Sequence, residues 1–371
     1  MQVVSRGVVL ALLVAITGCA HRPPMAVQQL ASSCQQVVPD RERPMVWIAP
    51  DDARDRDRLV KWCQTVGPVV VQSPAADAAP AIADRLAIIT WNVHVGGGDL
   101  EAIISALRRG EFTGGNAAPE FVLLLQEAHR EGSDVPSRFP AGSPLPRPIV
   151  ERPPGGIRRD IRVIAARAGL HLFYAPAMRN NSAERAAAAE DRGTAILSTL
   201  PLADLQVIEL PFERQRRVAL AASVAGRTSD AAAWQLRLAN VQIDTTLALT
   251  RGGPVAARRR QAEALLEALS RPDLMRSGLR TEESAPRTSM ILGGDFNTWL
   301  GNKEPAVEVM SRAFPDTPRP AEVATWRGPL GAHATLDHVF VRGPFRFVST
   351  RRLSGRFGSD HYPLLTLVDF K

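Results

Sequence analysis

The stretch LAIITWNV, residues 86–93, is an apolar run rich in β-branched and aromatic residues, and it ends in the polar residue Asn92. Such a run is typical of a buried strand. A helical pattern over residues 100–109 follows it, and then a second apolar run over residues 121–126. A strand, a helix and a strand in this order favour α/β layering over an all-β sandwich.

The alternation of apolar runs and helical patterns continues to the C-terminus. Helical periodicity is also present in residues 157–168 and 255–269. The predicted strands are more numerous than one open sheet usually holds, so we expect two sheets packed face to face with helices outside. The further predicted strands are residues 194–200, 205–210, 218–224, 234–243, 290–294, 338–341, 345–350 and 364–369.

The composition is that of an ordinary soluble globular protein. The 371 residues include 45 Lys+Arg and 38 Asp+Glu, which gives a net charge of +7, with 45% hydrophobic and 22% charged residues. These values exclude a disordered chain, a collagen and a small cysteine-rich scaffold. The positive charge suits a polyanionic partner, either nucleic acid or an anionic phospholipid headgroup.

The N-terminus has the pattern of a bacterial lipoprotein signal peptide. Arg6 precedes an apolar run over residues 8–16, and Thr17-Gly18-Cys19 follows. At about 1.5 Å per residue the run is too short to cross about 30 Å of hydrocarbon. We expect lipidation of Cys19 after removal of the leader, the alternative being an ordinary secretory signal. Ala20 in the next position favours anchoring at the outer membrane, facing the periplasm, and we expect a monomer there.

Three regions follow from these patterns. Residues 1–19 are the predicted signal peptide, residues 20–83 a tether and a small N-terminal unit, and residues 84–371 the catalytic domain. In an exported protein the remaining pair, Cys34 and Cys63, favours a disulfide over two reduced thiols. An Ala- and Pro-rich linker is expected over residues 66–83. Residues 133–156 contain seven prolines and are expected to form a long loop, either a functional rim or a surface insertion.

Polar side chains follow several predicted strands at the point where each strand ends. Taken singly, an Asn or Asp there is most often a turn former or cap. We interpret His338, and also His94 and His129, as structural histidines. The strand-end residues are Asn92, Glu127, Asn240, Gln242, Asp295, Asn297, Asp337, Asp360 and His361.

In this order the motifs resemble those of the endonuclease/exonuclease/phosphatase superfamily, the deoxyribonuclease-I-like fold. The resemblance covers the chain from about Leu86 to the C-terminus and implies a four-layer α/β sandwich with two mostly antiparallel or mixed sheets. It also implies hydrolysis of phosphodiesters or phosphomonoesters with a divalent metal, Mg²⁺ or Mn²⁺. The matching motifs are Trp91-Asn92, Gln126-Glu127, Gly294-Asp295-Phe296-Asn297, Leu336-Asp337-His338 and Ser359-Asp360-His361.

The resemblance also assigns roles. Glu127, Asn92 and Asp337 would hold the metal, since a hard cation prefers oxygen ligands. Asp295 would orient or deprotonate the attacking water, and Asn297 would bind a phosphoryl oxygen.

His361 would bind the phosphate and stabilise the charge of the transition state. Asp360 would accept the other ring proton of His361 and fix its tautomer.

One position departs from the family pattern. Where many members have Asn-x-His, this chain has Asn240-Val241-Gln242. An amide donates a hydrogen bond but cannot transfer a proton, and loss of a general acid typically costs about 10²–10⁴-fold in rate. Three functions therefore stay open: a phosphodiesterase, with a nuclease preferred; a phospholipid or small-molecule phosphoesterase or phosphatase; and a catalytically weak polyanion-binding module.

Three basic stretches are candidate phosphate-binding surfaces. They are Arg158-Arg159, Arg214 to Arg217 and Arg258 to Arg260. A solvated helix face is the preferred interpretation of the first and the last.

Overall fold

The protein is described by a computed structural model over residues 23–28, 33–38, 45–74, 81–116, 118–137, 157–179, 189–245, 253–271, 289–318 and 323–371. The predicted signal peptide with Cys19 and most of the Pro-rich loop, residues 138–156, lie outside these ranges. No helix in the described ranges combines the length and apolar character needed to cross a membrane.

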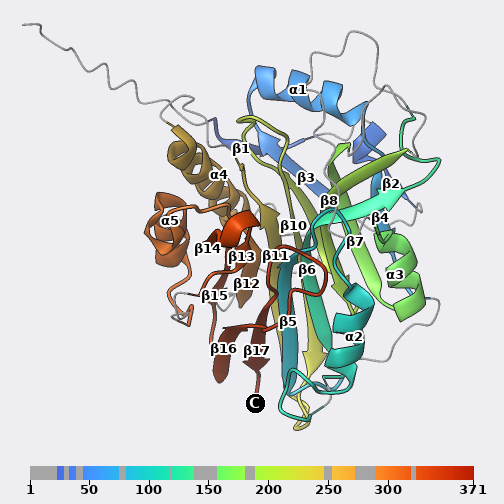
Figure 1. The fold of residues 1–371 in the computed structure, drawn as a ribbon, viewed down its shortest axis with the longest axis vertical. Coiled ribbons are helices and arrows are strands. Elements are labelled where there is room, and N and C mark those ends of the chain that lie inside the picture. The colour runs from blue at the N-terminus through green and yellow to red at the C-terminus, as the bar shows by residue number, and fades with distance from the viewer. Residues whose placement is uncertain are drawn as a thin grey trace, which may run out of the picture.

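Two large mixed sheets form the centre of the fold (Figure 1). The seven-stranded sheet has the order β1-β3-β9-β10-β11-β12-β15, and the eight-stranded sheet the order β16-β17-β5-β6-β8-β7-β4-β2. Most neighbours are antiparallel, whereas β3–β9, β11–β12, β5–β6 and β2–β4 are parallel. The predicted fold class, an α/β sandwich of two mixed sheets, is thereby confirmed.

The strand bounds place most predicted strands within a few residues of their expected ends. In the seven-stranded sheet they are β1 Met25–Val27, β3 Met45–Pro50, β9 Ala203–Glu209, β10 Val218–Arg227, β11 Ala233–Gln242, β12 Met290–Asp295 and β15 Asp337–Arg342. In the eight-stranded sheet they are β2 Val37–Val38, β4 Val69–Gln72, β5 Arg85–Asn92, β6 Phe121–Glu131, β7 His171–Arg179, β8 Glu190–Ser198, β16 Phe347–Arg352 and β17 Leu364–Asp369. A separate two-stranded ribbon consists of β13 Trp326–Arg327 and β14 His333–Ala334.

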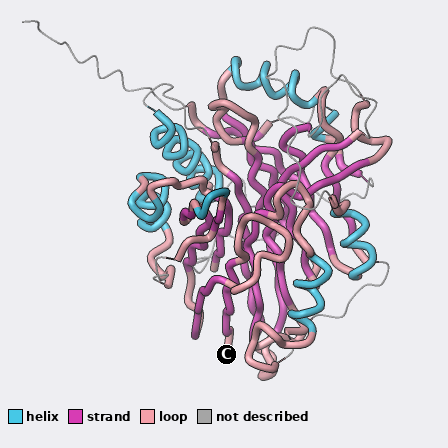
Figure 2. Tube along the Cα trace, viewed as in Figure 1, coloured by secondary structure: helices cyan, strands magenta, loops and turns pink. Residues whose placement is uncertain are grey.

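Helices cover the outer faces of both sheets and make the sandwich four layers thick. In Figures 1 and 2, α4 and α5 lie on the left of the strands, and α2 and α3 on the right. Apolar residues of α4 and α5 share a core with the seven-stranded sheet, and those of α2 and α3 share another with the eight-stranded sheet. The helices are α1 Ala53–Cys63, α2 Leu100–Arg108, α3 Ile161–Ala168, α4 Gly253–Ser270 and α5 Pro305–Ala313, with short 3₁₀ turns at Ser33–Gln35, Gly301–Lys303 and Pro329–Gly331.

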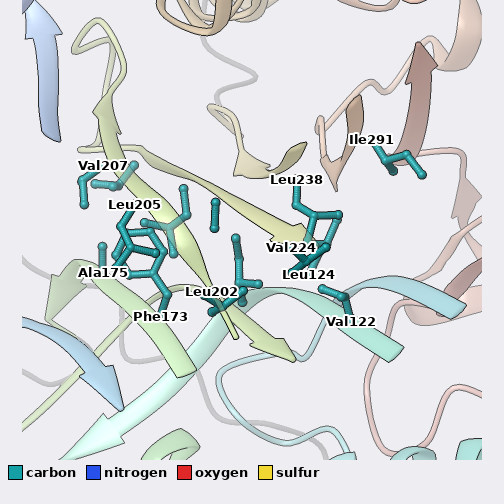
Figure 3. Packing of buried hydrophobic residues seen from close by; sticks show 14 of the residues in the cluster. Val122, Leu124, Phe173, Ala175, Leu202, Leu205, Val207, Val224, Leu238 and Ile291 are labelled. Atoms are coloured by element: carbon teal, nitrogen blue, oxygen red, sulfur yellow. The ribbon is translucent and has the colours of Figure 1, made fainter. Parts of the chain in front are cut away.

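A third apolar core fills the space between the two sheets (Figure 3). Val122 and Leu124 of β6 face it from one sheet, and Leu238 of β11 and Ile291 of β12 from the other. All four side chains are at most 1% exposed. Because this core is dry and close-packed, it fixes the strand ends of one sheet relative to those of the other.

The N-terminal segment differs from the expected small unit and linker. Strand β3 pairs with β9 in the seven-stranded sheet, and β4 pairs with β7 in the eight-stranded sheet. Residues 45–72 therefore extend both layers of the sandwich, because their apolar strands bury more surface against the sheet edges than they could alone. The predicted disulfide between Cys34 and Cys63 is present.

His338 on β15 is a structural histidine, as the sequence predicts. Its side chain is buried, and its Nε2 lies within hydrogen-bond distance of Thr298 Oγ1, at 2.7 Å, while that hydroxyl donates to the carbonyl of Thr335 at 3.0 Å. Burial lowers the pKa of His338 from 6.5 to about 4. The folded protein therefore keeps this ring neutral at pH values where the unfolded chain protonates it.

The buried His338 makes stability depend on pH. Between pH 6.5 and 4 the unfolded state binds the extra proton, so stability is lost as pH falls through this window, by about 3 kcal/mol in total. Urea unfolding at pH 7 and pH 4.5 measures the loss. In His338→Gln this part of the pH dependence is expected to vanish, and an unchanged slope in that variant would contradict the assignment.

Candidate active site

Strand register brings the predicted residues to one end of the sandwich. In the seven-stranded sheet Gln242 is the register partner of Asp295, and Asp295 is also the partner of Asp337. In the eight-stranded sheet Asn92 is paired with Gln126. Neighbours in register point to the same face of a sheet, so these side chains form a polar end to the otherwise apolar space between the sheets.

Glu127 lies at a β-bulge in β6. The pairing of β6 with β8 shifts register between Leu125 and Ala128, and Glu127 has φ of 55°. A positive φ is strained for a glutamate, and such strain occurs at sites where a side chain must be redirected. The bulge turns Glu127 toward the seven-stranded sheet, where it meets Gln242 at 2.8 Å.

Two side-chain amides join Glu127 to Asp295 across the sheets. Asn92 Nδ2 donates to Glu127 Oε1 at 3.2 Å and to Asp295 Oδ2 at 3.0 Å. Gln242 Nε2 donates to the same two oxygens at 2.8 and 3.2 Å. The two carboxylates are therefore held side by side by four hydrogen bonds from neutral groups.

The two carboxylates differ in their affinity for protons. Burial acts to raise the pKa of Glu127, but the positive charge of Arg192 and the Gln242 hydrogen bond outweigh it, so the pKa is below its ordinary value. Burial raises the pKa of Asp295 to about 6, and Asp337 adds to the rise. Glu127 is therefore an anion at neutral pH, whereas Asp295 is poised to take up a proton.

His361 is held by its own loop and by Trp91. Its backbone N–H donates to Ser359 Oγ at 3.0 Å, and its carbonyl accepts from Trp91 Nε1 at 3.1 Å. Ser359 Oγ in turn donates to the carbonyl of Asn92 at 2.7 Å. These contacts give a structural reason for the Trp91-Asn92 and Ser359-Asp360-His361 motifs, which lie far apart in the chain.

Asp337, not Asp360, is the partner of the His361 ring. His361 Nδ1 lies 2.8 Å from Asp337 Oδ2. Burial would lower the pKa of His361, but Asp337 and the other nearby carboxylates raise it to about 10. The expected Asp360–His361 pair is therefore wrong, because adjacent residues on this loop point to different neighbours. His361 is a cation at neutral pH, with one ring nitrogen committed to Asp337.

Asp360 instead forms a second pair with His94. His94 Nδ1 lies 2.6 Å from Asp360 Oδ1, and Trp326 Nε1 donates to Asp360 Oδ2 at 2.9 Å. Burial acts to raise the pKa of Asp360, but the His94 hydrogen bond and the charge of His361 lower it to about 2. The structural interpretation of His94 therefore needs correction, because its ring is part of the site.

One predicted catalytic residue is fully engaged within the protein. Asn240 is inaccessible, donates to the carbonyls of Leu125 and Ala195 at 2.9 and 2.7 Å, and accepts from Gln126 Nε2 at 2.6 Å. These bonds join the two sheets directly beneath Glu127. Asn240 therefore positions the site and cannot contact a substrate, contrary to its expected catalytic role.

Asn297 is held in place on both sides. Its backbone N–H donates to Asp295 Oδ1 at 3.0 Å, and its side chain donates to the carbonyl of Ile243 at 3.0 Å. It has φ of 48°, so it shares with Glu127 and His94 a left-handed backbone conformation at this end of the sheets. Its direct contact to a phosphoryl oxygen stays a prediction.

The residues present fit a divalent cation. One ligand atom each of Asp295, Asp337 and His361 lie within 4.8 Å of one another, and the carboxylates are the members that suit a cation, because His361 is itself positively charged. Asp337 Oδ1 is buried and has no hydrogen-bond partner among the described residues, which is unusual for a carboxylate oxygen and consistent with a place for a cation. Asn92 presents its amide nitrogen to the carboxylates, and its oxygen accepts from the backbone N–H of His94; its role as a metal ligand stays a prediction.

The basic stretches are mostly paired and partly buried. Arg216 and Arg258 are almost fully buried and form ion pairs with Glu209 and Glu304. The solvated-face interpretation is therefore wrong for Arg258. Further ion pairs in these stretches are Arg158 with Glu190, Arg159 with Asp99, Arg259 with Glu263 and Arg260 with Glu213.

Comparison with known proteins agrees with this geometry. A model of the Endonuclease/Exonuclease/phosphatase family matches residues 89–361. No curated protein matches the sequence.

Several solved structures are similar to this chain at low sequence identity. An endonuclease/exonuclease/phosphatase family protein from Leptotrichia buccalis is 13% identical, with a TM-score of 0.47 over 77% of this chain and 99% of that chain. A truncated TDP2 from Caenorhabditis elegans is 15% identical, with a TM-score of 0.40 over 77% and 97%. A beta toxin mutant from Staphylococcus aureus with bound magnesium ions is 10% identical, with a TM-score of 0.38 over 76% and 98%.

Proposed function

Because the chain belongs to the Endonuclease/Exonuclease/phosphatase family, we propose that it hydrolyses phosphodiester bonds by in-line attack of water, with Mg²⁺ as cofactor and Mn²⁺ as a substitute. The observation that carries the proposal is the cluster of Asp295, Asp337 and His361, with Glu127 bridged to Asp295 by two amides. An acidic site beside a buried imidazolium suits the anionic phosphate and its transition state.

The carboxylates of Glu127 and Asp337 would hold the cation, since hard cations prefer oxygen ligands. When bound, Mg²⁺ would polarise the phosphoryl group and offset its negative charge. Asp295, with its pKa of about 6, is placed to accept a proton from the attacking water. His361, positively charged through its pKa of about 10, is placed to donate to a phosphoryl oxygen as charge develops there.

The substrate and the location are also part of the proposal. The net charge of +7 supports a polyanionic substrate, with nucleic acid first and a phospholipid headgroup or small phosphoester second. The basic and apolar leader that ends at Cys19 supports a lipid anchor in the cell envelope, at the outer membrane and facing the periplasm. We propose a monomer at that surface.

The first experiment addresses the type of reaction. The purified protein is assayed on bis(p-nitrophenyl) phosphate and on p-nitrophenyl phosphate, with Mg²⁺, with Mn²⁺ and with EDTA. We expect turnover of the diester with either metal and its loss in EDTA, with recovery when Mg²⁺ is added back. The monoester should be the poorer substrate.

Other outcomes favour the alternatives. Release of phosphate from the monoester alone would assign a phosphatase. No turnover of either compound, together with binding of DNA that is unchanged in Glu127→Ala, would assign a polyanion-binding module. If the diester is hydrolysed, DNA, RNA and phospholipid vesicles compared at one ionic strength decide the substrate class.

A further inference from the structure

We propose that Arg217 is a positioning residue of this site, which acts through Gln242 to hold Glu127 and Asp295 side by side. The inference rests on the proposed function, because it concerns the same carboxylates. Arg217 immediately precedes β10, and its backbone carbonyl accepts from the N–H of Leu210 at 3.0 Å. Its side chain is 3% exposed, although it carries a permanent charge.

Arg217 fixes which way the Gln242 amide points. Its Nη1 donates to Gln242 Oε1 at 2.7 Å, so the amide oxygen faces the guanidinium. The amide nitrogen must then face the other way, where Glu127 Oε1 and Asp295 Oδ2 accept from it. With the amide turned over, its donors would face the guanidinium and its oxygen would face two carboxylates, which is electrostatically unfavourable on both sides.

The second bridging amide, that of Asn92, is oriented by a backbone group. Asn92 Oδ1 accepts from the backbone N–H of His94 at 2.9 Å, so its nitrogen also faces the carboxylates. The site thus has two amides that donate to the same two oxygens, one oriented by a backbone group and the other by Arg217. The Gln242 bridge therefore depends on a single side chain.

The hydrogen bonds of the Arg217 side chain support a role in the site. Its Nη2 donates to Gln215 Oε1 at 3.1 Å, while its Nε, also buried, finds no partner within the described part of the chain. A buried cation with an unsatisfied donor is costly to folding. The negative charges of Asp244, Glu127 and Asp295 favour its charged form, but burial outweighs them and lowers the pKa of Arg217. Arg217 gives the acidic site a counter-charge behind Gln242.

A double-mutant cycle tests this role. Arg217→Met and Gln242→Met should each lower kcat/KM by roughly 10- to 100-fold, the range for a hydrogen bond to a charged group. The double variant should be no slower than Gln242→Met alone, because Arg217 acts through that amide. Arg217→Lys should recover part of the loss, since it restores a cationic donor. The control is Arg227→Met, at the exposed far end of β10, which should match the unmodified protein.

A second measurement does not require turnover. In ¹⁵N-glutamine-labelled protein, the side-chain amide of Gln242 is assigned by its disappearance in Gln242→Met. Its hydrogen exchange should be slow in the unmodified protein and at least tenfold faster in Arg217→Met, because one side of the amide loses its partner.

The outcomes separate the two proposals. If the protein has no phosphoesterase activity but the Gln242 amide exchanges slowly, and this protection is lost in Arg217→Met, the positioning role is kept and the enzymatic function is rejected. If the losses in kcat/KM of the two single variants multiply in the double variant, the positioning role is overturned while the function stays in place. Hydrogen exchange of the Gln242 amide that is unchanged in Arg217→Met would have the same consequence. Far-UV circular dichroism and thermal melts of each variant exclude an unfolded protein as the cause.

Discussion

His361→Gln is expected to lower kcat by roughly 10³-fold, and also to lower the thermal midpoint because Asp337 is left buried without its cationic partner. Glutamine keeps a hydrogen-bond donor but removes the positive charge, which Asp337 and neighbouring carboxylates maintain through a pKa of about 10. The charge matters most in the transition state, where negative charge accumulates on the phosphoryl oxygens, so kcat should change more than KM. Steady-state kinetics on the diester measures the two separately.

The Asp337→Asn variant tests the charge of His361 through the pH dependence of the activity. A cationic His361 is lost as pH rises through its pKa, so the unmodified protein should stay active up to about pH 10. Without the Asp337 charge, the pKa of His361 should fall and the alkaline limit should move toward neutral pH.

The matched control for His361→Gln is His333→Gln, which alters an exposed histidine of β14. Equal activity of His361→Gln and His333→Gln would remove His361 from the mechanism.

The apolar strands of the sandwich could be predicted from the sequence because each is a short run bounded by turn residues. Residues 86–92 of the first run, 121–126 and 290–294 are found within the strands β5, β6 and β12. Their burial on both faces makes them continuously apolar, which is the clearest signal that a strand gives.

The unpredicted elements lack that signal. Strand β7, His171–Arg179, is entirely buried, yet it contains Pro176 and begins and ends with polar residues. Strand β3 extends the sheet through contacts with β9, 160 residues later in the chain, as its pairing of Val46 with Gln206 shows. Tertiary pairing, which no local pattern encodes, decides both.

The sequence predicts which residues form the site, but not which of these residues pair with one another. Asp295, Asp337 and His361 meet as expected, because strand ends converge at one edge. The partners of the two histidines could not be read from the sequence: Asp360 lies beside His361 in the chain but pairs with His94, 266 positions away. Arg217 is likewise hidden, since its importance comes only from the orientation that it imposes on Gln242.

Asp295→Asn is expected to lower kcat by roughly 10²–10⁴-fold, the range for loss of a general base. Asparagine has nearly the same shape, and its oxygen can still accept from the backbone N–H of Asn297. Its amide nitrogen, however, would face the donors of Asn92 and Gln242, where Asp295 Oδ2 now accepts two hydrogen bonds. The variant therefore removes the base and also weakens the bridge to Glu127.

The pH profile identifies which of these losses dominates. With a pKa of about 6, Asp295 is protonated and unable to accept a proton at lower pH, so kcat of the unmodified protein should rise with pH through about 6. If Asp295 is the base, this acid limb should be absent from the residual activity of Asp295→Asn. As a control, Asp369→Asn alters an aspartate of β17 that forms an ion pair with Arg85 of β5. This variant should keep both the rate and the acid limb of the pH profile. A slow Asp295→Asn variant that retains the limb would mean that Asp295 acts by orienting its neighbours, and that another group accepts the proton.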